Sequence, residues 1–282
     1  PQIIRIKIFK NKTSEGFSYN LTGSARPHAG LFTINQSANK IVLETTHIIT
    51  EVYKEPYFRI VFKNTKGEIL NADVNEADAV YRYGNKVLLQ KQIQPGEKFI
   101  GLGEALGNAN RRGSIVTLDN TDNYRYKDER IPMYSSIPFY MGIHQKNSYG
   151  LYFHNNSRAT FNFGASTPDR VTVSFDAGEA DYFFMYDSTI TGILNHYTSI
   201  TGRMELPPLW SLGYHQSRCS YYPDEESEWI AESFRKKKIP LDAIVLDAHY
   251  QNNYQPFVTN RKLFPNLPAL SEKLTAVTLL FI

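Results

Sequence analysis

The hydrophobic pattern of this chain of 282 residues changes its period once, near residue 187. Before that point short runs alternate polar and apolar residues, as in Gln2–Phe9 and Tyr57–Phe62, and turn signals such as Pro95-Gly96 separate the runs. Alternation with a period of two residues is typical of strands that bury one face. Many short strands of this kind, without a strong helical pattern, favour an antiparallel β-sandwich.

Beyond residue 187 helical patterns and buried strands follow one another. Ser188–Ser199 can form a helix, and Gly202 with Pro207-Pro208 indicates a linker. The elements expected after the linker are a strand at Leu209–Tyr214, a helix from Asp224 to about Lys238, a strand at Leu241–Leu246, a helix at Pro268–Leu274 and a strand at Ala276–Ile282. Asp224 is the expected N-cap of the first of these helices. This order of elements is the opening of an α/β domain with a parallel sheet.

We therefore expect an N-terminal antiparallel β-sandwich over residues 1–190, a linker with a helix over 191–208, and the first βα units of a (β/α)8 barrel over 209–282. A complete barrel needs about 250 residues, far more than the last region contains. Its third strand would also leave an unpaired edge, which compact proteins avoid. The chain is thus expected to be a fragment, or its barrel to be completed by another chain.

Composition argues against several classes of protein. A net charge of +3 without a long basic run gives no support for nucleic-acid binding. The single cysteine, Cys219, excludes an internal disulfide, and the longest strongly apolar run, Ala276–Ile282, is too short to span a bilayer. The aromatic content of 13% fits a β-rich core, and aromatic rings also form platforms for sugars. The compartment (cytoplasmic, periplasmic or secreted) and the oligomeric state stay open.

Asp247 is the first candidate functional residue, because it directly follows the buried strand Leu241–Leu246. Functional residues collect at the carboxyl ends of parallel strands. A carboxylate there needs hydrogen-bond donors, and a pair of sugar hydroxyls would supply them. The alternative is that Asp247 caps a helix or holds a loop. The polar loop Leu118–Asn123 in the sandwich is, on its own, typical of a turn.

His249 alternates with Asp247 along the chain, so the two side chains could face the same way. A metal site would need a third ligand, and none is evident, so we expect no metal. A lone histidine is more often structural than catalytic. The run Gly101-Leu102-Gly103-Glu104 lacks a third spaced glycine and a clear following helix, so we expect no nucleotide and no other cofactor.

Taken together, the ordered motifs resemble glycoside hydrolase family 31, the family of α-glucosidases and α-xylosidases. The matching stretches are Phe99–Glu104, Tyr134–Tyr140, Tyr149–Phe153, Asp181–Phe184 and, most strongly, the run from Tyr197 to Pro265. Each motif alone is weak, but their order and spacing match over roughly residues 95–270. The first 90 residues resemble the family's N-terminal sandwich only in character.

The resemblance implies a galactose-mutarotase-like β-sandwich followed by a (β/α)8 TIM barrel that hydrolyses terminal, non-reducing α-linked glucosides with retention of configuration. It implies that Asp247 binds the sugar in the −1 subsite. It also implies that a loop of the sandwich, Asn120-Thr121-Asp122, brings Asp122 to the sugar. His249 stands where the family usually has a second acidic residue, and we take it as a third substrate-binding candidate.

The resemblance also implies that the nucleophile and the acid/base aspartate follow the fourth and sixth barrel strands, beyond Ile282. We therefore assign no catalytic residue in this chain, and expect it to be inactive alone. The expected partner is an α-linked oligosaccharide or glucoside. Two alternatives stay open: α-xylosidase specificity within the family, and a non-catalytic carbohydrate-binding or interaction module.

Overall fold

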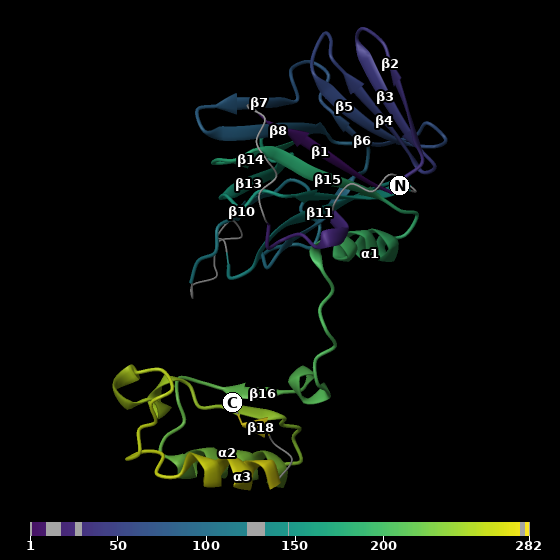
Figure 1. Cartoon of the computed structure of the whole chain (residues 1–282). Helices are drawn as coiled ribbons and strands as arrows, with labels where there is room; N and C mark the ends of the chain where they lie inside the picture. The colour runs from purple at the N-terminus through teal and green to yellow at the C-terminus, as the bar shows by residue number, and fades with distance from the viewer. Residues whose placement is uncertain are drawn as a thin grey trace. The chain divides into compact units, whose positions relative to one another are not determined.

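The structure, a computed structural model, describes residues 2–9, 18–25, 30–122, 133–145, 147–276 and 280–281. The chain divides into two compact units, Pro1–Arg203 and Met204–Ile282, which we describe one at a time (Figure 1).

Two antiparallel sheets make up the first unit. Over the described residues the smaller sheet has five strands, in the order β1 (Ile3–Ile8), β15 (Ala180–Tyr186), β12 (Asn147–Phe153), β11 (Ser136–His144) and β9 (Lys98–Gly103). The larger sheet runs in the order β10 (Ile115–Leu118), β13 (Ala159–Phe163), β14 (Arg170–Phe175), β8 (Lys86–Gln92), β6 (Ile69–Asp73), β5 (Arg59–Asn64), β4 (Ile48–Tyr53), β3 (Lys40–Thr45) and β2 (Phe32–Gln36), with β7 (Val80–Tyr83) also paired to β8. A 3-10 turn, η1, covers Gly23–Ala25. The predicted antiparallel sandwich is therefore confirmed.

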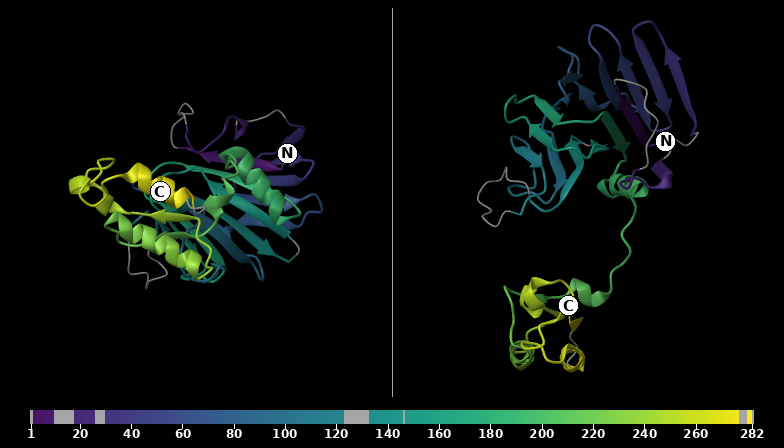
Figure 2. Two further views of the ribbon diagram at one scale, coloured as in Figure 1. Left: turned by 90° about the horizontal axis from the view of Figure 1, so that it is seen from below. Right: turned by 60° about the vertical axis from the view of Figure 1, so that its left-hand side comes forward.

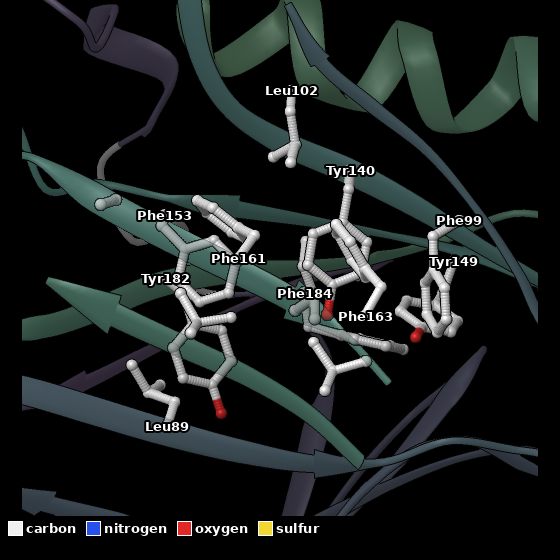
Figure 3. Close-up of a cluster of buried hydrophobic side chains, with 14 of the residues drawn as sticks. Leu89, Phe99, Leu102, Tyr140, Tyr149, Phe153, Phe161, Phe163, Tyr182 and Phe184 are labelled. Atoms are coloured by element: carbon white, nitrogen blue, oxygen red, sulfur yellow. The ribbon is translucent and has the colours of Figure 1, made fainter. Parts of the chain in front are cut away.

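The core of the first unit lies between the two sheets and is rich in aromatic rings (Figure 3). The pattern of β14 shows how it forms, since Val171, Val173 and Phe175 are buried while the residues between them are half-buried. Phe62 of β5 and Phe184 of β15 stack across the sheets with ring centroids 3.9 Å apart. The high aromatic content of the sequence is thus largely a core property.

The outer face of the five-stranded sheet is also apolar, because the helix α1 (Ile190–Thr201) covers it (Figures 1 and 2). Ile193 and Ile200 of α1 pack in one cluster with Phe183 and Met185 of β15. The helix approaches so closely that a Cβ atom on Gly150 would lie 2.8 Å from Ile193 Cγ2. Glycine is therefore required where α1 crosses β12.

Because of this packing, the first unit ends at Arg203, beyond the end expected for the sandwich at residue 190. The helix placed in the linker belongs to the first unit, since its apolar face packs on the sheet. Thr189 is its N-cap, with the side chain accepting from Gly192 N at 3.0 Å.

Over its described residues, the second unit has a three-stranded parallel sheet in the order β16 (His215–Ser217), β17 (Ala243–Val245) and β18 (Leu280–Phe281). The helices α2 (Asp224–Lys236) and α3 (Leu267–Ala276) contact each other (Figure 1), and both contribute to an apolar cluster with Ile244 of β17. Three 3-10 turns complete the unit: η2 (Leu209–Leu212), η3 (Ala248–Tyr250) and η4 (Asn252–Tyr254). Strands joined by helices in this way form the start of a (β/α)8 barrel.

Two local expectations were wrong. The strand expected at Leu209–Tyr214 is the turn η2, because Pro208 precedes it and both Leu209 and Leu212 are exposed and bury no strand face. The barrel strand is the more polar segment that follows, β16. Asp224 is the first residue of α2 rather than its N-cap; Pro223 occupies that position without a side-chain cap. Of the strand expected at Ala276–Ile282, residues 277–279 and 282 lie outside the described residues.

The first unit also buries an ion pair between neighbouring strands. Lys91 of β8 and Asp73 of β6 are each 1% exposed, with Nζ 2.6 Å from Oδ1. Burial lowers the pKa of Lys91, but the attraction of Asp73 outweighs it and holds that pKa above its usual value. Asp73 Oδ2 also accepts from Ile60 N at 2.7 Å.

We expect Lys91→Met to lower the free energy of unfolding by roughly 3–5 kcal/mol, because it leaves Asp73 buried without its partner. The double variant Lys91→Met/Asp73→Asn should recover much of this loss, since asparagine still accepts from Ile60 N but carries no charge. Urea denaturation measures both changes. Equal stability of the single and double variants would show that the buried charge is not the cause.

Glu97 is a second buried ionisable group, 1% exposed, whose Oε1 accepts from Tyr149 OH at 2.7 Å. Burial raises the pKa of Glu97 to about 7, although the bonds from Gln94 N and Tyr149 and the charge of Arg112 act in the opposite direction. The unfolded chain ionises this group near its ordinary pKa of 4.5. Between these two values the unfolded state therefore releases a proton that the folded state still holds.

The stability of the first unit should accordingly fall as the pH rises from about 4.5 to about 7 and level off above, with a total loss of about 3 kcal/mol from this group. Glu97→Gln is neutral at every pH and should lack this part of the decrease. Denaturation curves at several pH values between 4 and 8 test the difference. The same pH slope in both proteins would contradict the assignment.

Candidate functional site

The carboxyl ends of β16 and β17 lead into two loops that meet at the same edge of the parallel sheet. Arg218–Ser220 follows β16, and Leu246–His249 follows β17. A hydrogen bond joins the loops, because Ser220 Oγ lies within bonding distance of His249 Nδ1. In parallel α/β domains this edge is where binding and catalytic groups gather.

Asp247 marks the change from buried strand to exposed loop. Leu246 is buried, whereas Asp247 is exposed and begins the turn η3, its Oδ1 accepting from Ala248 N at 2.6 Å. Its backbone has φ 63° and ψ −167°, a conformation that only glycine adopts without strain. The carboxylate of Asp247 therefore caps a short turn, and its exposure leaves it open to a ligand.

His249 is held on several sides. Its ring stacks on Tyr222, with centroids 5.0 Å apart, and meets the edge of Tyr254 at 5.8 Å. Its Nε2 lies 3.4 Å from Tyr254 OH, and its backbone N donates to Ser220 Oγ at 3.4 Å. Asp247 and His249 thus lie in one short turn, with the imidazole fixed by its neighbours and the carboxylate open to solvent.

Exposed aromatic rings lie in the same loops. In this chain, which holds only the first units of the barrel, Tyr254 is 67% exposed and Phe257 is 94% exposed. Both have positive φ values, as do Asn253, Asp247 and Ser220. Of the eight non-glycine residues with positive φ in the described parts of the chain, five therefore lie in the loops after β16 and β17. Strain of this kind gathers at functional sites.

Asp122 lies in the first unit, in the loop that follows β10. Its Oδ1 accepts from Tyr134 OH at 2.8 Å, and Asn120 Oδ1 accepts from Ser136 Oγ at 2.6 Å. Thr121 N donates to Met133 O at 3.0 Å. The segment 120–122 is therefore tied to residues 133–136, while Asp122 itself stays exposed.

A polar hollow of about 410 Å³ adjoins this loop in the first unit. The residues that line it include Asp119, Asn120, Ser136, Asn156 and Arg158. Arg158 Nε lies 3.3 Å from Asp119 Oδ2. Amide, hydroxyl and charged groups of this kind suit a ligand with many hydroxyls.

Within the described residues of the chain, no group of three or more His, Cys, Asp or Glu side chains is placed to hold a metal ion. Over the same residues, no helix combines the length and apolar character that a membrane crossing requires.

Of the residues described in these loops, Asp247, His249 and Asp122 were predicted from the sequence as site residues, whereas Ser220, Tyr222 and Tyr254 were not. Tyr254 could have been noticed as an aromatic residue a few positions after the strand-end motif. No sequence pattern indicated Ser220, because its burial and its positive φ depend on packing between two loops.

Two family models match this chain. The glycosyl hydrolase 31 N-terminal galactose mutarotase-like domain matches residues 1–162, and the glycosyl hydrolases family 31 TIM-barrel domain matches residues 204–282. Together with the sandwich and the parallel strands of the second unit, they show that this chain belongs to glycoside hydrolase family 31.

Similar proteins are known both by sequence and by structure. Alpha-glucosidase 2 of Bacillus thermoamyloliquefaciens is 36% identical over 238 residues, covering 84% of this chain and 30% of the relative. An alpha-xylosidase of Lactiplantibacillus pentosus is 26% identical over 77% of this chain and 29% of its own length. The family 31 dextranase of Flavobacterium johnsoniae, solved in complex with glucose, matches with a TM-score of 0.91 and 28% identity over 100% of this chain and 34% of its own. The chain thus spans about a third of the length of these relatives.

Proposed function

We propose that the protein containing this chain hydrolyses terminal, non-reducing α-linked glucosides with retention of configuration. Family membership and the similarity to an alpha-glucosidase support the reaction class. The observation that carries the proposal for this chain is the position of Asp247. It offers an exposed carboxylate directly after a buried parallel strand, in a loop with exposed aromatic rings.

In this proposal Asp247 accepts hydrogen bonds from hydroxyls of the sugar at the −1 subsite. A charged acceptor forms stronger hydrogen bonds than a neutral one, which suits a ligand that presents several donors. Asp122, in the loop after β10 of the first unit, is proposed by itself as a further sugar-binding carboxylate, and His249 lines the same turn as Asp247. The exposed rings of Tyr254 and Phe257 offer faces for sugar rings.

Retaining hydrolysis needs a nucleophile and an acid/base about 5–5.5 Å apart. We place both carboxylates in barrel units that follow Ile282. The share of the relatives that this chain spans supports that placement, since most of their length lies outside the match. Within this chain the site residues bind and orient the sugar, and they make or break no covalent bond.

The proposal includes a second possible substrate sugar, xylose in place of glucose. The similarity to an alpha-xylosidase keeps α-xylosides as the second substrate class. The two sugars differ by the hydroxymethyl group, so the substrate preference reports whether the pocket accepts that group.

The protein that continues past Ile282 should release nitrophenol from nitrophenyl α-glucoside, and the chain ending at Ile282 should not. A colorimetric assay of both proteins, with nitrophenyl α-xyloside as a second substrate, tests this. Turnover by the short chain at the rate of the longer protein would refute the placement of the reacting carboxylates. Failure of the longer protein on both substrates would refute the proposed activity.

In the longer protein, Asp247→Asn should lower kcat/KM for the glucoside by about 100-fold or more, because two charged hydrogen bonds to the sugar lose about 3 kcal/mol in total. Asparagine can still accept from Ala248 N, so the turn is retained. Asp169→Asn is the matched control, because Asp169 is exposed and lies in the turn before β14, outside the candidate site. Equal kcat/KM in the two variants would remove Asp247 from the site.

A further inference from the structure

The hydroxyl of Ser220 contacts both the ring and the backbone of His249. Ser220 is 1% exposed, and its φ of 82° places it in the left-handed region. Its backbone is held by Arg218, since Ser220 N donates to Arg218 O at 2.7 Å and Arg218 Nε donates to Ser220 O at 3.0 Å. The hydroxyl therefore has a fixed position between the loops after β16 and β17.

Both nitrogens of the His249 ring have a hydroxyl neighbour. Ser220 Oγ lies within hydrogen-bond distance of His249 Nδ1 and also accepts from His249 N at 3.4 Å. His249 Nε2 lies 3.4 Å from Tyr254 OH. A hydroxyl can donate or accept, so these contacts satisfy the ring nitrogens in either tautomer. The contact with Ser220 is the shorter of the two and therefore holds the ring more firmly.

Asp247 lies two residues before His249 and has a strained backbone. Its carboxylate bonds Ala248 N, a contact within the turn itself. A strained turn persists only when its surroundings hold it. Packing of Leu246 holds one end of the turn, and the bonds of Ser220 to His249 hold the other.

We propose that Ser220 is a positioning residue that holds the ring of His249 in one tautomer and thereby fixes the turn that presents Asp247. This inference rests on the proposed function, because it concerns the same sugar-binding carboxylate. Ser220 itself touches no sugar. It acts through His249, and its loss should change the geometry of the turn rather than remove a contact to the ligand.

The chain supplies a matched control in Ser227 of α2. Ser227 is 0% exposed, and its hydroxyl has no hydrogen-bond partner among the described residues. Ser220→Ala and Ser227→Ala therefore remove the same atom from two buried sites of the same unit, and only the first removal breaks a link to His249. Ser220→Gly adds a second test, because glycine adopts a φ of 82° without strain and removes the hydroxyl as well.

In the longer protein that continues past Ile282, Ser220→Ala and Ser220→Gly should each raise KM for nitrophenyl α-glucoside about tenfold, because the carboxylate is no longer held in place. Ser227→Ala should stay within about twofold of the parent. Spectra of protein labelled with 15N-histidine, with His249→Asn to assign the signals, should show one tautomer of His249 in the parent and a mixture in both Ser220 variants.

Unchanged nitrogen signals in both Ser220 variants would show that Ser220 does not hold the tautomer of His249. An unchanged KM in the presence of altered signals would overturn the link from His249 to Asp247. If the parent protein hydrolyses no α-glucoside, the proposed function fails by itself. The nitrogen spectra then decide whether Ser220 holds the tautomer of His249. Titration of the parent and the variants with isomaltotriose decides whether Ser220 also affects sugar binding at Asp247.

Discussion

Burial of both faces of the five-stranded sheet is the constraint on which the first unit depends. On β15, Tyr182 and Phe184 face the core between the sheets, while Phe183 and Met185 face α1. A strand that is apolar on both faces cannot lie at the surface, so the second sheet and the helix must both be present. The close approach at Gly150 shows how tightly the helix is held. The folded unit consequently ends with α1 rather than with its last strand.

The same constraint explains what the sequence could predict. Alternating runs such as that of β14 bury one face and gave correct strands. The run Asp181–Tyr186 does not alternate, and this was the available sign that a further element covers its outer side. The expected boundary at residue 190 lies before the end of the unit because the sequence does not show which surface the apolar face of the helix covers. In the barrel unit, Leu209 and Leu212 suggested a strand by apolar character alone, although the residues that pair in the sheet are the polar ones of β16.

The candidate site was predictable only in part. Asp247 and His249 could be predicted because they follow a buried strand within three residues. Ligands of parallel α/β sheets bind at the carboxyl ends of the strands. Asp122 needed the resemblance to a family, since its loop is an ordinary turn by composition. Ser220 could not be predicted at all, because it follows a different strand and its contact with His249 arises from strand order. Only the parallel pairing of β16 with β17 brings the two loops to one edge.

The placement of strain distinguishes the two loops from the rest of the chain. A positive φ at Ser220 and at Asp247 costs free energy that packing in the unit must offset. The positive φ of Ser220 places a buried hydroxyl between the two loops. The positive φ of Asp247 accompanies a carboxylate that is exposed although the preceding Leu246 is buried. A residue that served only to end the strand at position 247 could be glycine without that cost. The presence of an aspartate at this strained, exposed position supports the binding role that we propose for it, and it links the geometry at the end of β17 to the proposed sugar chemistry.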